Sequence, residues 1–102
     1  MSAKLIVVYW RDIPAQVIAK RGRETAKVAL PERFQVAIDR AAMRAGKGSS
    51  ERYLEDWRRD TRACAGELEA EARAEAERLI AAFDETVLER TVKAGGIRAG
   101  DD

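Results

Sequence analysis

The first thirty residues alternate between short apolar runs and polar breaks. Residues 4–10 contain Lys4 followed by a run of six apolar, β-branched and aromatic residues, which predicts a strand buried on both faces and central in its sheet. Residues 16–20 and 25–30 are predicted as two further strands, separated from the first by a break that contains Pro14. Gly22 lies between them and can adopt the positive φ of a hairpin turn. We therefore expect a three-stranded, mainly antiparallel sheet.

Beyond residue 30 the apolar spacing changes to three and four, which is typical of amphipathic helices. A first helix is predicted to begin at Pro31 and to end at Gly46. A second helix, capped by Ser49 or Ser50, follows at once. Its apolar stripe comprises Tyr53, Leu54 and Trp57.

No proline occurs between Thr61 and Lys93, and the apolar stripe continues, so one long C-terminal helix is predicted there. About 30 helical residues span about 45 Å, which exceeds the width of a domain of this size. The helix would therefore overhang and offer its stripe to a partner, or break near Gly66 and pack back on the sheet. The predicted helix interface is Leu79, Ile80, Phe83, Val87 and Leu88.

These elements predict an α+β fold: a three-stranded sheet packed by two helices, with a long helix attached. We divide the chain into a core domain over residues 1–60, the long helix over 61–94 and a flexible tail over 95–102.

Composition removes several classes of enzyme. The 102 residues include no histidine and a single cysteine, Cys64. Histidine-dependent nucleophilic catalysis, histidine-ligated metal sites and an intramolecular disulfide are therefore absent. No phosphate-binding glycine motif is present. We expect no catalytic residue, no metal site and no cofactor.

Charge is divided unevenly along the chain. Residues 1–50 hold ten Lys/Arg and four Asp/Glu, a net +6, whereas residues 51–102 hold nine and fourteen, a net −5. This asymmetry favours docking or head-to-tail association, and an acidic second half makes nucleic acid an unexpected partner. The apolar run at residues 5–10 is too short for a secretion signal or a membrane span. With one unpaired cysteine, we expect a cytoplasmic protein.

Two groups of residues are candidate binding sites, and each also has a structural interpretation. Trp10 and Arg11 could bind an anionic ligand or partner, or they could form a structural corner capped by Asp12. The second group is a basic hairpin tip that could clamp a phosphate or nucleic-acid backbone, or serve only as a solvated edge. It comprises Lys20, Arg21, Arg23 and Lys27.

Part of the chain resembles a known family. The segment Tyr-Trp-Arg-Asp-Ile-Pro-Ala-Gln-Val at residues 9–17 is similar to the opening of the bacterial virulence-factor domain, and the patterns at 34–46 and 53–57 are also similar. The resemblance covers roughly residues 3–60. Such domains occur alone and at the end of longer proteins that resemble conserved virulence factor C. The resemblance implies an association with folate- and corrinoid-dependent methyl-transfer proteins, and it implies no catalytic residues.

The sequence therefore predicts a non-catalytic accessory domain that binds another protein or a second copy of itself, and the resemblance implies a one-carbon enzyme as the protein partner. The alternative is a small anionic-ligand or nucleic-acid-backbone binder that uses the hairpin at residues 20–27.

Overall fold

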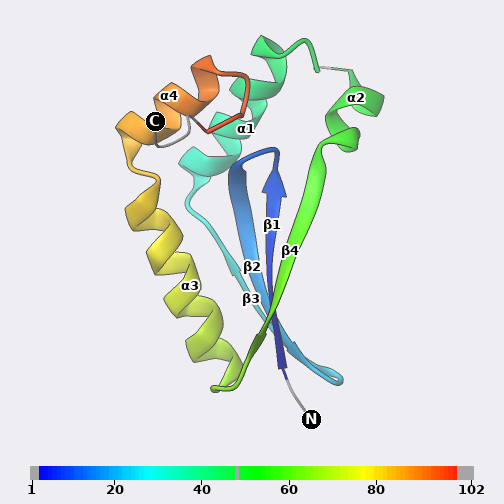
Figure 1. Ribbon diagram of the computed structural model, residues 1–102, viewed down its shortest axis with the longest axis vertical. Coiled ribbons are helices and arrows are strands. Elements are labelled where there is room, and N and C mark those ends of the chain that lie inside the picture. The colour runs from blue at the N-terminus through cyan, green and yellow to red at the C-terminus, as the bar shows by residue number, and fades with distance from the viewer. Residues whose placement is uncertain (1–2, 48, 99–102) are drawn as a thin grey trace.

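A four-stranded antiparallel sheet forms the centre of the computed structural model, which describes residues 3–47 and 49–98 (Figure 1). Its strand order is β3-β2-β1-β4. The strands are β1 (Ala3–Trp10), β2 (Ile13–Arg21), β3 (Glu24–Ala29) and β4 (Trp57–Cys64). β1 lies inside the sheet, as its continuous apolar run predicts, because such a run has to be covered on both faces.

Four helices complete the α+β fold: α1 (Glu32–Arg44), α2 (Ser50–Glu55), α3 (Leu68–Ala82) and α4 (Glu85–Lys93). Figure 1 shows α3 running along one side of the sheet with α1 and α4 above it, while α2 lies beside the start of β4. The core forms between this helical layer and the facing side chains of the strands, among them Leu5, Val17, Phe34 and Ile38. None of the helices in the described residues is both long and apolar enough to cross a membrane.

The prediction of three strands is wrong, because β4 was interpreted as helix. Trp57 was assigned to a helical stripe and Cys64 to the long helix, yet both belong to β4. Trp57 pairs with Trp10 and Cys64 with Ala3, so β4 covers the whole free edge of β1. Periodicity does not indicate this strand, because an edge strand that is exposed along most of its length has no alternating apolar pattern.

The prediction of one long C-terminal helix is also wrong. Phe83 leaves helical geometry, and the Asp84 side chain accepts a hydrogen bond of 2.9 Å from the Val87 backbone N–H, which begins a new helix. The chain therefore turns between α3 and α4. The turn folds the predicted interface back onto the domain: Leu79, Phe83 and Leu88 are buried, and Ile80 and Val87 are partly buried against the core.

The residues after α4 are also held by the domain. Gly95 and Gly96 both adopt positive φ, and the Asp12 backbone N–H donates a hydrogen bond of 2.9 Å to the Gly96 carbonyl. Residues 95–98 of the expected tail thus contact the first hairpin, whereas residues 99–102 lie outside the described residues.

Candidate interaction surfaces

The turn between β1 and β2 gathers the first predicted site. The Trp10 side chain is fully buried, and its indole N–H donates a hydrogen bond of 2.7 Å to the Tyr53 carbonyl. Arg11 adopts a positive φ of 53° and donates to the Asp56 carboxylate at 3.1 Å and to the Gly95 carbonyl at 2.9 Å. These contacts join the turn to the α2–β4 junction and to the end of α4. The Trp10 indole N–H and the Nε and Nη1 atoms of Arg11 therefore bind groups of the same chain.

Asp12 completes the corner as an acceptor. Its carboxylate accepts a hydrogen bond of 2.7 Å from the Arg98 backbone N–H and one of 3.4 Å from the Arg58 guanidinium. The Arg58 guanidinium also lies 4.3 Å from the centre of the Tyr9 ring. Burial, together with the nearby Asp60 carboxylate, raises the pKa of the Tyr9 hydroxyl above its ordinary value.

The hairpin tip does not bring its four predicted cations together. Arg21 is half-buried and donates a hydrogen bond of 3.2 Å to the Gly66 carbonyl, at the turn before α3. Arg23 lies in the turn itself and is exposed. Lys20 and Lys27 project from β2 and β3 on the face opposite Arg21, because successive residues of a strand alternate between faces.

That second face, which we call the open sheet face, is the side of the sheet away from α1 and α3 (Figure 1). The register identifies its twelve positions on the four strands. They are Lys4, Ile6, Val8, Gln16, Ile18, Lys20, Thr25, Lys27, Ala29, Arg59, Thr61 and Ala63. Four are cations and none is a carboxylate, so this face is uniformly basic.

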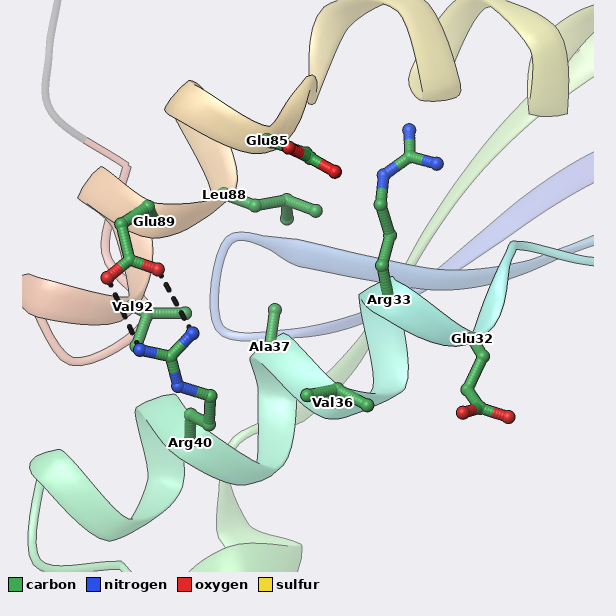
Figure 2. Close-up of a pocket in the computed structure, with 9 residues that line it drawn as sticks. All are labelled: Glu32, Arg33, Val36, Ala37, Arg40, Glu85, Leu88, Glu89 and Val92. Atoms are coloured by element: carbon green, nitrogen blue, oxygen red, sulfur yellow. Dashed lines mark hydrogen bonds and ion pairs between the residues drawn. The ribbon is translucent and has the colours of Figure 1, made fainter.

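A groove between α1 and α4 forms the second surface (Figure 2). It has a volume of about 440 Å³, a size typical of ligand-binding clefts. Its floor consists of the buried side chains Ala37, Leu88 and Val92, and Val36 on its α1 wall is 45% exposed. Met43 lies two turns further along α1, is 75% exposed, and lines an adjoining hollow with Val92. We call this surface the α1–α4 groove.

Polar residues frame the α1–α4 groove. The Arg40 guanidinium spans it and donates hydrogen bonds of 3.0 and 3.2 Å to the two Glu89 carboxylate oxygens, as Figure 2 shows. Arg33 lies further along α1, with its guanidinium 4.9 Å from the centre of the Phe34 ring. The Arg33 Nε atom is buried and has no hydrogen-bond partner among the described residues. The Arg33 guanidinium donates a hydrogen bond of 3.4 Å to the Ile80 carbonyl, which ties this side chain to α3. The groove therefore combines an apolar floor with charged walls.

The Arg40–Glu89 pair gives the groove a measurable pH dependence. Hydrogen bonding to Arg40, supported by the opposite charge, holds the pKa of the Glu89 carboxyl below its ordinary value. Because this pKa is lower in the folded state than in the unfolded state, the stabilisation is present above the unfolded pKa and is lost as the pH falls through the folded pKa. In a carboxyl NMR titration, Arg40→Gln should raise the Glu89 midpoint. Lys93→Gln removes a weaker contribution and should raise it less.

Sequence reasoning missed the α1–α4 groove. The predicted stripe of the first helix contained the residues that face the sheet, whereas Val36 and Met43 lie outside it. The one available signal was their spacing of seven residues, which places them on the same side of a helix. Among residues 3–47 and 49–98, no group of three or more potential metal-ligating side chains comes together.

Comparison with known proteins gives one match. A family model described as "Virulence factor" matches residues 8–92, which is most of the chain. The chain belongs to the virulence factor family. The match extends well beyond the segment that resembles the family by its motifs, so β4, α3 and nearly all of α4 are part of the virulence factor domain. No curated protein and no solved structure matches the chain.

Proposed function

We propose that this virulence factor domain is a non-catalytic, cytoplasmic accessory domain that binds another protein, and that the α1–α4 groove takes an apolar helical segment of that protein. The observation that carries the proposal is the exposure of Val36 and Met43 beside an apolar floor. Exposed apolar side chains gathered at a groove mark interaction sites more often than scattered ones do.

The shape and chemistry of the groove favour a helix as the occupant. α1 and α4 form two walls on either side of an apolar floor, and the exposed Arg40–Glu89 pair that bridges them would have to open for an occupant. An amphipathic helix places side chains at intervals of three and four residues into such a groove. A methionine at the rim suits this role, because its flexible thioether adapts to different apolar partners.

The class of partner follows from the family resemblance. Its association with folate- and corrinoid-dependent methyl-transfer proteins makes a one-carbon enzyme the first partner to test. The alternative function, an anionic-ligand or nucleic-acid-backbone site at residues 20–27, has weaker support, because Arg21 is engaged by Gly66 and lies on the face opposite Lys20 and Lys27.

A paired substitution tests the groove. Val36→Asp and Met43→Asp, combined in the tagged protein, should reduce the recovery of a co-purifying methyl-transfer enzyme at least tenfold, since charges would be buried against the partner's apolar side chains. Leu54→Asp is the matched control, because Leu54 is 64% exposed on α2, away from the groove. Circular dichroism should show that all variants remain folded.

Equal loss in the Leu54→Asp control, or full recovery in the groove variant, would place the interface elsewhere. Recovery of a protein that has no folate or corrinoid chemistry and depends on Val36 and Met43 would retain the groove and exclude the one-carbon partner.

A further inference from the structure

We propose that the open sheet face is a second docking surface, and that it binds an acidic segment of polypeptide. The proposal concerns a different face of the domain from the α1–α4 groove and does not depend on it. The carboxylates of the bound segment would lie on Lys4, Lys20 and Lys27.

Three lysines of this face are neighbours, so their charges repel one another. Lys4 and Lys20 are directly opposite across β1 and β2, and Lys27 is a diagonal neighbour of Lys20 on β3. Like charges in directly opposed positions destabilise a sheet. A bound carboxylate between these ammonium groups would replace this repulsion with attraction.

Cations on the two faces of the sheet differ in whether they form ion pairs. On the face toward α3, Arg62 of β4 pairs with Glu75 at 3.1 Å, and Arg58 of β4 pairs with Asp60 at 2.7 Å. In the described part of the chain, none of the four cations on the open sheet face forms an ion pair. These four cations lie on the face that neither α1 nor α3 covers, so a carboxylate from outside the domain can approach them.

The centre of the open sheet face indicates a polypeptide rather than a nucleic acid. Ile6 and Ile18 are cross-strand neighbours there and are only 9% and 7% exposed, and the half-buried Val8 continues the strip. None of the twelve positions is aromatic, so none of them offers a ring on which a base could stack. Trp57, at the start of β4, lies in the same row as Arg59, and its ring packs edge-on against the Tyr53 ring with 5.7 Å between their centres.

The test uses the full chain and a fluorescein-labelled peptide of alternating glutamate and alanine. A triple variant, Lys4→Gln, Lys20→Gln and Lys27→Gln, should weaken binding in fluorescence anisotropy at least tenfold. The control, Arg52→Gln, Arg73→Gln and Arg90→Gln, removes the same charge from exposed positions on the helices and should change binding less than twofold. Added salt should weaken binding by the native chain and leave the triple variant nearly unaffected.

Stability supplies a second readout. Because Lys4 and Lys20 oppose each other, Lys4→Gln alone should raise the melting temperature by about 1–5 °C without peptide. Weaker peptide binding by this more stable variant would separate a binding role from a structural one.

Three results would overturn the proposal. The first is equal weakening in the control variant, which would show unspecific attraction. The second is tighter binding of an oligothymidylate of the same charge, which would make the face a nucleic-acid surface. The third is concentration-dependent dimerisation that the triple variant abolishes, which would make the occupant a second copy of the chain.

Discussion

Replacing Gly96 with alanine should destabilise the domain by roughly 2–5 kcal/mol, measured as the free energy of unfolding in urea. Gly96 has a φ of 96°, which side chains rarely adopt, and an added Cβ would lie 2.7 Å from the Trp10 Cζ3 atom. Trp10 is fully buried and fixed by its hydrogen bond to Tyr53, so it has no space into which to move. The clash therefore adds to the backbone strain.

Gly46→Ala is the matched control for this prediction. Gly46 also has a positive φ, 72°, but nothing lies within 4 Å of an added Cβ. The control should show only the backbone strain of a side chain in the left-handed region, about 1–2 kcal/mol. Equal losses at Gly46 and Gly96 would show that Trp10 yields to the added methyl group and that the corner is not tightly packed.

Phe83→Ala should destabilise the domain by about 3–5 kcal/mol in the same measurement. Phe83 is 4% exposed, its ring packs edge-on against Phe34 at 6.2 Å, and the Arg98 guanidinium lies 4.7 Å from its centre. Truncation would leave a cavity between α1 and the turn that separates α3 from α4. α1 and α3 both pack on the sheet, which keeps them from moving together to close this cavity.

Leu54→Ala serves as the control for Phe83, since a side chain that is 64% exposed should change stability by no more than about 0.5 kcal/mol. The same experiment distinguishes a core residue from an interface. If Phe83→Ala left stability unchanged but altered the molecular mass in light scattering, Phe83 would belong to an intermolecular contact and the burial seen in one chain would be misleading.

Local sequence patterns predict the elements in which apolar periodicity matches the buried face. The hairpin around Gly22 and the helix from Glu32 to Arg44 follow from alternation, turn chemistry and a repeating apolar stripe. β4 could not be found in this way, because its backbone pairs with β1 while most of its side chains face solvent. The break at Asp84 was hidden for a related reason: the apolar stripe continues across it at helical spacing, and a capping aspartate is a weak signal inside a stripe.

The candidate surfaces depend on information that only the fold supplies. Lys20 and Lys27 were recognised as a basic group, but Lys4 and Arg59 join them only through the register of β1 with its two neighbours. The α1–α4 groove requires the turn before α4, since a continuous helix would carry Leu88 away from Ala37. Sequence patterns thus indicate individual side chains, whereas the topology determines which of them share a surface.

The pairing of β1 with β4 has a consequence during synthesis. Trp57 is synthesised 47 residues after its partner Trp10, and Cys64 is synthesised 61 residues after its partner Ala3. One edge of the most apolar strand therefore stays unpaired while the intervening chain is made. At about 5–20 residues per second this lasts several seconds. An unpaired edge with the run Leu-Ile-Val-Val-Tyr-Trp is a template for aggregation. Once added, β4 replaces it with an outer edge rich in arginine, which discourages further strands from joining.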